Sequence, residues 1–432
     1  MPKPPELETT TSPTALAEAA LIDVGLALLF VVLPHGLFGD AMGRFEALRG
    51  FIEHRTLSPM ASSFVQPLAS VPFYLLGKVF LTPQWWCARF NTVLFGAGLV
   101  AARRLMRTAA EREVLRRFAL LLIAASMFPN HLRNYGGEVF TAMLVAVGIV
   151  AVHAGHELAG WTAVVAGVVN TPASMVGLAL MVLARRWRVR RWTHALAVPA
   201  AAALILLEAW VRRGSPWTTG YENNAGFATI MPYSGRPGFS YPFFFGILSI
   251  LFSFGRGLIF FAPGLLLWIR RPATIGDRLH GTYTLWMWFL VGLILVYAKW
   301  WAWYGGLSWG PRFFLFASIP AALAIAAKLH DIRGSSMPAL GALLLALTLS
   351  TWVGIAGAAF DQVGLDLCSQ NNYALEAACW YVPEFSVLWR PLIVGAIPQE
   401  LTVIIVAYCV VVYMTLAAPV IVEIVRRAAS RT

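Results

Sequence analysis

Long apolar runs recur along this chain and leave few folds open to it. The clearest run, residues 338–360, contains no charged side chain. A helix needs roughly 20 apolar residues to cross the hydrocarbon core of a bilayer. Only 12% of the 432 residues are charged, against roughly 25% in soluble proteins, so the chain lacks the charge to cover a water-facing surface. The sequence therefore predicts an all-α polytopic membrane protein.

The apolar runs predict about 11 to 13 helices in one transmembrane domain over residues 19–432. Between residues 160 and 191 the run is interrupted at Asn170-Thr171-Pro172. Pro172 lacks an N–H and disfavours helix at Thr171, so two half-length helices are expected to meet there. We expect the other spans near residues 19–38, 85–102, 114–129, 138–154, 193–211, 257–269, 282–300, 313–328, 338–360 and 401–424.

The positive charges predict the orientation of the spans, because Lys and Arg collect in cytoplasmic loops. Arginines follow the span near 85–102, and five more lie between Arg185 and Arg191. This distribution predicts a multi-pass protein of the cytoplasmic membrane with both ends inside. Residues 1–18, polar and rich in proline, are expected to form a disordered cytoplasmic tail. Three long segments are then expected outside: 40–84, 212–256 and 361–400.

The first external segment has the pattern of helices lying in the membrane interface. Phe45, Leu48, Phe51 and Ile52 recur at helical spacing with charged residues between them, which predicts an amphipathic helix over residues 41–54. A second short apolar run, broken by prolines, follows it and predicts another interfacial helix.

Asp40 is the most informative acid, because it stands at the outer end of the first predicted span. A membrane anchor does not need a carboxylate there. One interpretation makes Asp40 a general base for chemistry at the membrane boundary. The other makes it a capping residue of the interfacial helix that follows. Glu138, which opens another outward-facing span, is either a second acid or a carboxylate favoured by the helix dipole.

Basic and polar residues on the same predicted face are candidate ligands. Arg312 is the leading candidate for a phosphate, because its planar fork binds phosphate oxygens bidentately; the alternative is an arginine that snorkels to the interface. Arg256 and Lys299 are further phosphate candidates. Residues that could contact a sugar or acceptor are Glu46, His35, Tyr221 and Glu222. Of these, Glu46 also fits a solvated helix face, and His35 also fits an interior histidine.

The cysteines and the search for cofactor motifs limit which disulfides, metals and cofactors the sequence predicts. Of four cysteines, Cys368 and Cys379 lie in the last external segment and are predicted to form a disulfide in an oxidising compartment. No cysteine or histidine spacing suggests zinc or haem, and no nucleotide-binding loop is found. No cofactor is therefore predicted, a divalent metal is left open, and no nucleic-acid partner is expected.

Several motifs in order carry a resemblance to a known family. The chain has an aspartate after the first span, interfacial helices in the first external loop, and a Gln-Pro-Leu stretch at Gln66 where relatives carry Lys-Pro-Pro. Further motifs are "NYGGEVF", "TTGY", "FGRGLIFFAPG" and "WYGGLSWGPRFF". From about Ala19 to Leu329 the sequence resembles the GT-C glycosyltransferases, most of all bacterial relatives of protein O-mannosyltransferases and lipid A aminoarabinose transferases. Asp40 lacks the adjacent glutamate of the Asp-Glu pair in these relatives.

The resemblance implies a function. Such enzymes transfer a monosaccharide from a polyprenyl-phosphate donor to a glycan, lipid or protein acceptor, with inversion, at the outer face of the bacterial inner membrane. Asp40 would then be the general base and Glu138 a second acid. Arg312, Arg256 and Lys299 would compensate the charge on the donor phosphate.

A flippase for lipid-linked sugars or a solute transporter is the alternative, because such proteins also have broken helices and intramembrane polar residues. Their essential ionisable residues should lie in mid-span, yet the predicted spans are nearly free of charge. No internal repeat is visible either. The transferase is therefore the favoured hypothesis.

Overall fold

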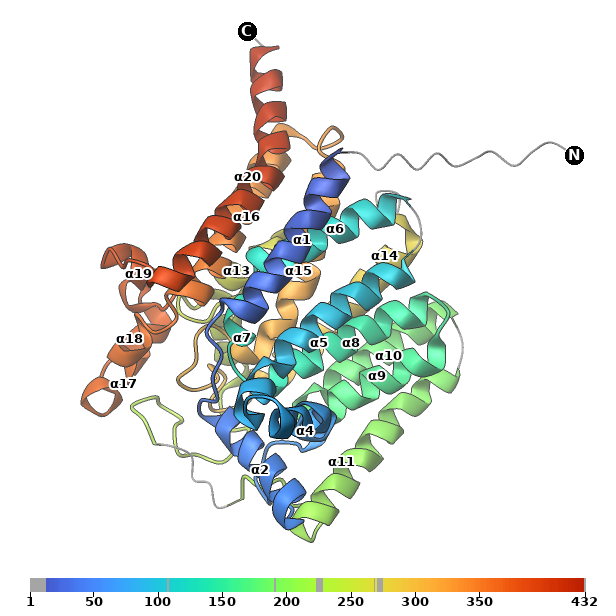
Figure 1. Ribbon diagram of the computed structural model, residues 1–432, viewed down its shortest axis with the longest axis vertical. Coiled ribbons are helices and arrows are strands. Elements are labelled where there is room, and N and C mark those ends of the chain that lie inside the picture. The colour runs from blue at the N-terminus through green and yellow to red at the C-terminus, as the bar shows by residue number, and fades with distance from the viewer. Residues whose placement is uncertain are drawn as a thin grey trace, which may run out of the picture.

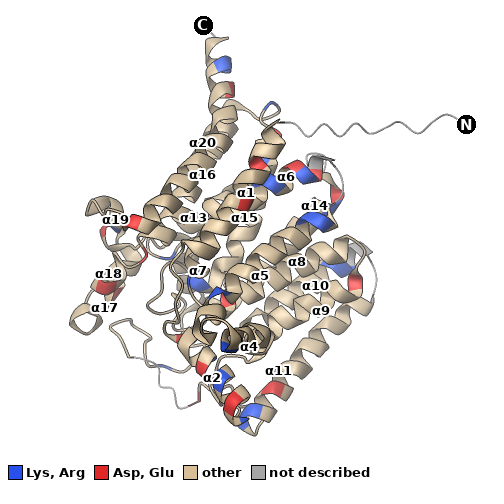
Figure 2. Ribbon diagram, in the orientation of Figure 1, with Lys and Arg blue, Asp and Glu red and all other residues tan. Residues whose placement is uncertain are grey.

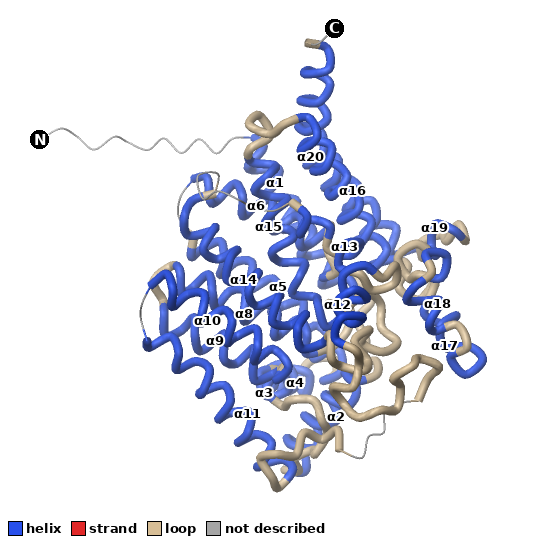
Figure 3. The backbone as a smooth tube through the Cα atoms, turned by 180° about the vertical axis from the view of Figure 1, so that it is seen from behind, coloured by secondary structure: helices blue, strands red, loops and turns tan. Residues whose placement is uncertain are grey.

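The computed structural model describes residues 13–106, 109–189, 192–222, 228–267, 269 and 275–430. In these residues all regular structure is helical, and the single β-bridge is an isolated contact between Gly36 and Asn134. Figure 3 shows the helices packed side by side, with most of the loop backbone gathered at one end. The predicted class, an all-α polytopic membrane protein, is confirmed.

Apart from α2 (Asp40–His54), which lies at one end, eleven helices of at least 13 residues form the bundle within the described part of the chain. They are α1 (Pro13–Val31), α5 (Pro83–Leu105), α6 (Ala109–Ala124), α8 (Gly137–His153), α9 (Glu157–Asn170), α10 (Met175–Val189), α11 (Ala197–Arg213), α14 (Gly276–Tyr297), α15 (Ser318–His330), α16 (Met337–Ala359) and α20 (Glu400–Ala429). Six helical stretches in the described residues are long and apolar enough to cross a membrane, including Thr193–Arg213 and Arg312–His330.

Small and apolar residues determine how these helices pack. In α15 almost every side chain is buried, as expected of a helix that is apolar all round and lies at the centre of a bundle. Helices α8 and α9 approach closely at Gly148 and Gly160, where a Cβ on Gly148 would lie only 2.6 Å from the carbonyl oxygen of Gly160. Close backbone approach through small residues is a common way for membrane helices to associate.

The predicted break in the fifth apolar run is present. Helix α9 ends at Asn170, a short 3-10 turn covers Pro172–Ser174, and α10 begins at Met175. The Asn170 amide donates to the carbonyl oxygen of Gly137 over 2.9 Å, and its Oδ1 accepts from the N–H of Gln66 over 3.2 Å. The Thr141 hydroxyl donates to the carbonyl oxygen of Gly167 over 2.8 Å, and the Ser174 hydroxyl donates to that of Thr171 over 2.6 Å. Side chains thus satisfy carbonyl groups at the broken backbone, as a break at membrane depth requires.

Three helices follow α1 and form one end of the molecule. They are α2 (Asp40–His54), α3 (Val65–Ala69) and α4 (Val71–Val79), and α2 matches the amphipathic helix predicted over 41–54. Its residues Ala41, Phe45 and Leu48 are buried. Figure 1 shows α2 at the end of the bundle opposite the start of α1 and the end of α20. Charged residues are sparse along the middle of the bundle and gather toward its ends (Figure 2).

The structure corrects two expectations about the first helix. Helix α1 begins at Pro13, so residues 13–18 are helical rather than disordered. Glu18 is buried and pairs with Arg116 over 2.7 Å and with Arg117 over 3.2 Å, which explains why this polar part of the chain is ordered. Residues 1–12 lie outside the described part. The helix also ends at Val31, earlier than predicted, and a loop over 32–39 leads to α2.

The span predicted near 257–269 is wrong as a continuous helix. The structure has α12 (Phe243–Phe252), then a turn, α13 (Leu258–Phe261) and a 3-10 turn over Pro263–Leu266. Pro263 ends α13. At Gly255 the backbone lies against Cys379, because a Cβ there would come 2.1 Å from the carbonyl oxygen of Cys379. Packing against a distant segment therefore accompanies the turn between α12 and α13, and Pro263 interrupts the run after α13.

That distant segment is a small helical unit between α16 and α20. It contains α17 (Leu365–Tyr373), α18 (Glu376–Tyr381), a 3-10 turn over Pro383–Phe385 and α19 (Arg390–Ile393), and it lies on one side of the bundle (Figure 1). Cys368 and Cys379 form a disulfide with Cα atoms 6.0 Å apart. We refer to residues 361–399 as the cap.

Candidate functional site

Two loops that are far apart in the sequence are joined at the α2 end of the bundle. The side chain of Asn134 accepts from the N–H of Phe38 and donates to its carbonyl oxygen, both over 3.2 Å. The Asn91 amide donates to the carbonyl oxygen of Asn134 over 2.8 Å. Since Phe38 precedes α2 and Asn134 precedes α8, this pairing brings Asp40 and Glu138, in the first turns of these helices, into one place.

Arg312 lies between the two acids. Its Nη1 donates to Asp40 Oδ2 over 2.9 Å, and its Nε is 3.9 Å from Glu138 Oε1. The Asp40 side chain is 66% exposed and that of Arg312 only 27%. Asp40 thus has an oxygen open to solvent, while the cation is sheltered. We refer to Asp40, Glu138 and Arg312 as the acid–arginine cluster.

Asp40 is part of the helix α2 rather than its N-cap. The N-cap is Gly39, whose φ of 56° is in the left-handed region, and no side chain caps this helix. The Asp40 carboxylate accepts a hydrogen bond from Arg312 instead, a residue that is distant in the sequence. The interpretation of Asp40 as a capping residue therefore has no hydrogen bond to support it.

Arg256 lies behind the cluster and supports the loop that carries Arg312. It is 1% exposed. Its guanidinium donates to the carbonyl oxygens of Gly306, over 2.9 Å, and Gly310, and it lies 4.0 Å from the centre of the Trp380 ring in the cap. Arg256 is predicted to bind phosphate. In the structure its Nη1 and Nη2 are directed at these loop carbonyls, so it positions the loop.

Lys299, the third predicted phosphate ligand, is exposed. Its carbonyl oxygen accepts from the N–H of Tyr241 over 3.0 Å, but no described contact brings its ammonium to the acid–arginine cluster. The next residue, Trp300, packs edge-on against Tyr221 with ring centres 5.6 Å apart.

Tyr221 lies close enough to interact electrostatically with the charged residues of the site. Asp40, Arg312, Arg44 and Glu138 all act electrostatically on its phenol. Partial burial and then the Asp40 charge raise the pKa of Tyr221, while the two arginines oppose them. Half of the surface of the residue is exposed.

Two other predicted acids have local partners. Glu222 accepts from the N–H groups of Thr219, over 2.5 Å, and Gly220, over 2.7 Å; these backbone hydrogen bonds lower its pKa to about 2. Glu222 therefore closes the turn that holds Tyr221. Glu46 pairs with Arg49 over 2.6 Å on the solvated face of α2.

Two histidines are largely buried near the site. His35 Nε2 is 2.9 Å from Thr92 Oγ1, and burial, followed by the Arg89 charge, lowers its pKa to about 4. His35 is thus an interior histidine. His131 was not among the predicted site residues. Burial lowers its pKa to about 4, and the charges of Glu138 and Arg312 also act on it.

Arg44 is the more important residue that sequence reasoning missed. It lies four residues after Asp40, on the same face of α2, and is 9% exposed. Its Nη1 donates to the carbonyl oxygen of Ser63 over 3.1 Å and to Gln66 Oε1 over 3.3 Å. The spacing from Asp40, and its position on the apolar face of α2, are the signals that could have found it.

No group of three His, Cys, Asp or Glu residues that could hold a metal occurs in the described residues.

The fold and the cluster define a multi-pass helical membrane protein with a polar site at one end of its bundle. No protein-family model matches the sequence, and no curated protein matches it. Two solved structures are similar in fold: ArnT from Cupriavidus metallidurans bound to undecaprenyl phosphate, at 14% identity, and the same protein in the apo state, at 15%. Each comparison has a TM-score of 0.52 and covers 97% of this chain and 79% of the ArnT chain. The chain therefore has the GT-C fold that its motifs predicted.

Proposed function

We propose that this protein is a glycosyltransferase that uses a polyprenyl-phosphate-linked sugar. It transfers the sugar to a glycan, lipid or protein acceptor at the outer face of the bacterial inner membrane and inverts the anomeric carbon. The observation that carries the proposal is the acid–arginine cluster, which combines a proton acceptor with a phosphate-binding cation. The similarity in fold to an ArnT structure that holds undecaprenyl phosphate supports this donor class.

Asp40 acts as the general base. Its exposed carboxylate accepts the proton of the acceptor hydroxyl as the oxygen attacks the anomeric carbon. A single displacement of this kind inverts that carbon. Glu138, which is largely buried on the other side of Arg312, orients the acceptor or takes part in the proton transfer.

Arg312 binds the donor phosphate and stabilises it as it leaves. A guanidinium forms two parallel charge-assisted hydrogen bonds to phosphate oxygens, and a fixed cation stabilises the negative charge that develops on the leaving group. In the free protein Arg312 pairs with Asp40. A donor phosphate competes for Arg312, so donor binding frees Asp40 to accept a proton.

The site belongs at the external face of the cytoplasmic membrane. Both described ends of the chain lie at the end of the bundle opposite α2 (Figure 1), and the clusters of Lys and Arg predict that their end is cytoplasmic. A lipid-linked donor reaches the boundary from the bilayer, and the acceptor reaches it from outside. A cluster at one end of the bundle suits this reaction better than transport, which needs a site near mid-membrane.

A transfer assay with the purified protein in nanodiscs tests the proposal. Radiolabelled polyprenyl-phosphate pentoses and hexoses are offered with cell-envelope acceptors, and label transfer is measured. Asp40→Asn should reduce transfer by a factor on the order of 10² or more and retain binding of undecaprenyl phosphate. The matched variant Asp366→Asn, on the exposed face of α17, should behave as wild type.

Two outcomes would contradict the proposal in different ways. Near-normal transfer by Asp40→Asn would refute the base assignment and point to Glu138. Movement of labelled lipid across proteoliposomes with the sugar–phosphate bond intact, and no transfer with any donor, would show a transporter instead.

A further inference from the structure

We infer that Arg44 is a second phosphate-binding cation of this site, so that the donor phosphate is held between Arg44 and Arg312. The inference rests on the proposed function and extends it to a residue that neither the sequence motifs nor the fold similarity identify.

Arg44 is a buried cation whose hydrogen-bonding capacity is mostly unused. Its described hydrogen bonds come from Nη1 alone and end on neutral acceptors, the Ser63 carbonyl oxygen and Gln66 Oε1. No described carboxylate forms an ion pair with it. Its Nε and Nη2 donate to no described residue, yet they are not sealed from open space. A guanidinium has five N–H donors, so most of them remain for a ligand.

The position of the guanidinium places those donors beside the acid–arginine cluster. It lies against the start of α8, where a Cβ on Gly137 would come 2.8 Å from Nη2 and 3.0 Å from Cζ. Among the charges that act on Arg44, those of Glu138 and Asp40 are the carboxylates. The N-terminus of a helix favours an anion, and no side chain caps α8. Arg44 and the first turn of α8 therefore lie together, and both favour negative charge beside the cluster.

The balance of charges explains why one arginine is not enough. The cluster contains two carboxylates, Asp40 and Glu138, and one guanidinium, Arg312. Arg312 alone therefore leaves a formal excess of negative charge within the cluster, which opposes the binding of a phosphate. Arg44 makes the set neutral before the donor binds. During transfer the lipid phosphate gains a negative charge as the sugar leaves, and a second cation stabilises that charge.

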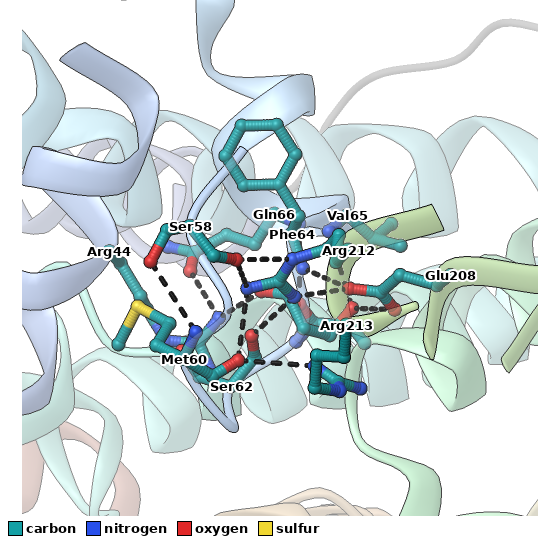
Figure 4. A network of polar contacts seen from close by, with 12 residues as sticks. Arg44, Ser58, Met60, Ser62, Phe64, Val65, Gln66, Glu208, Arg212 and Arg213 are labelled. Atoms are coloured by element: carbon teal, nitrogen blue, oxygen red, sulfur yellow. Dashed lines mark hydrogen bonds and ion pairs between the residues drawn. The ribbon is translucent and has the colours of Figure 1, made fainter. Parts of the chain in front are cut away.

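Residues 58–66, the loop that leads from α2 into the start of α3, carry both acceptors of Arg44, the Ser63 carbonyl oxygen and Gln66 Oε1. A network of polar contacts with α11 holds this loop in place (Figure 4). Glu208 in α11 accepts from the N–H of Phe64 over 2.7 Å and from Ser63 Oγ over 2.8 Å, and it pairs with Arg212 over 2.6 Å. Arg212 donates to the carbonyl oxygens of Ser58, Met60 and Ser62.

Arg212 and Arg44 differ in the partners of their guanidinium groups. Both are buried arginines that contact the same loop, but Arg212 has a carboxylate partner in Glu208 and distributes its donors among three carbonyls. Arg212 thus has a structural role that its contacts account for. Arg44 has no such partner. A buried cation without a close counter-ion is costly, and an anionic ligand would remove that cost.

Binding of undecaprenyl phosphate to the full-length protein in nanodiscs tests the inference. Arg44→Gln keeps an N–H donor for the loop and removes the charge. We expect it to weaken binding of undecaprenyl phosphate by about tenfold or more, with Arg44→Lys intermediate. Arg49→Gln is the matched control, because Arg49 lies on the same helix with its side chain 46% exposed, and its affinity should match wild type. Binding of undecaprenol, which lacks the phosphate, should be equal in all variants.

Each outcome is decisive. Unchanged affinity of Arg44→Gln for undecaprenyl phosphate overturns the inference, and so does an equal loss of undecaprenol binding, which would show only a disturbed loop. If wild type transfers sugar while Arg44→Gln keeps its affinity, this inference alone fails. If wild type neither binds undecaprenyl phosphate nor transfers sugar, the proposed function fails with it. Should Arg44→Gln not fold, Arg44→Lys decides, because an ammonium cannot replace the planar fork. A loss of undecaprenyl phosphate affinity with unchanged undecaprenol binding supports the inference, and wild-type affinity overturns it.

Discussion

Arg312 donates a hydrogen bond from Nη1 to Asp40 Oδ2 over 2.9 Å, although 272 residues separate them in the chain. Asp40 is the first residue of α2, and Arg312 opens the 3-10 turn (Arg312–Ala317) that leads into α15. Glu138, at the start of α8, is the third member of the cluster. The starts of three helices thus meet at one point, and the residues that open them carry the charges of the site.

Substitutions of Arg312 should distinguish the contribution of its positive charge to donor binding and transfer from that of its planar guanidinium geometry. Arg312→Ala should weaken binding of undecaprenyl phosphate and slow transfer, because the leaving phosphate loses a cation. Arg312→Lys should restore only part of each, since an ammonium cannot replace the planar fork. Affinity titrations and single-turnover rates measure both effects, with Arg49→Ala as the control. Unchanged affinity in Arg312→Ala would place the phosphate elsewhere, at Arg44 or Lys299.

A glycine next to Arg312 offers a test of its placement. Gly305 has a φ of 79°, and a Cβ there would lie 2.9 Å from Arg312 Cγ. Gly305→Ala should therefore strain the backbone by about 1 kcal/mol or more and displace Arg312, and we expect single-turnover transfer to fall by about tenfold. Gly341→Ala is the control, because its Cβ meets nothing within 4 Å. Wild-type transfer by Gly305→Ala would show that the position of Arg312 tolerates change.

The disulfide should stabilise the cap and, through it, the loop of Arg312. Replacing Cys368 and Cys379 by serine should cost about 3 kcal/mol on the chain-entropy model. Trp380, beside Cys379, lies on the guanidinium of Arg256, so transfer should also slow. In the oxidised, unfolded protein, alkylation should modify only Cys87 and Cys409. Modification of all four cysteines before reduction would show that the bridge does not form.

Labelling from outside the cell should reveal the orientation of the chain. Single cysteines introduced within 40–60, 214–240 and 362–395 should react with a membrane-impermeant maleimide, because these segments are predicted to be external. Cysteines within 185–191 and 270–278 should react only after the membrane is permeabilised. External labelling within 185–191 would contradict the proposal that α9 and α10 return to the cytoplasmic side.

Acid should destabilise the protein through His35. Its pKa is lowered from 6.5 to about 4 in the folded protein, so below pH 6.5 the unfolded chain takes up a proton that the folded protein does not. The stability is therefore present above pH 6.5 and is lost as the pH falls toward 4. Thermal unfolding across this range should show a falling Tm that His35→Gln flattens, while the exposed His54→Gln follows wild type. An equal fall in His35→Gln would assign the effect to other groups.

The sequence by itself determined the helices, because the free energy that places an apolar run in a membrane is local to that run. The amphipathic pattern of 41–54 gave α2 for the same reason, and the missing N–H of Pro172 gave the break after α9. The two failures also have physical causes. Glu18 is ordered by arginines of α6, nearly a hundred residues away. The run near 257–269 is interrupted by Pro263 after α13, and the turn at Gly255, which packs against the cap, separates it from α12.

Only the tertiary structure decided which charged residues form the site. Asp40 and Glu138 were predicted as separate acids, and nothing local to either one indicates that Arg312 lies between them. Arg256 was predicted to bind phosphate, but the carbonyls of a distant glycine-rich loop occupy its donors. Arg44 has only a weak signal in the sequence, which is its spacing from Asp40 on the apolar face of α2. Its burial and unused donors arise only when α2, α8 and the 58–66 loop pack together, and long-range packing of that kind has no local signal in the sequence.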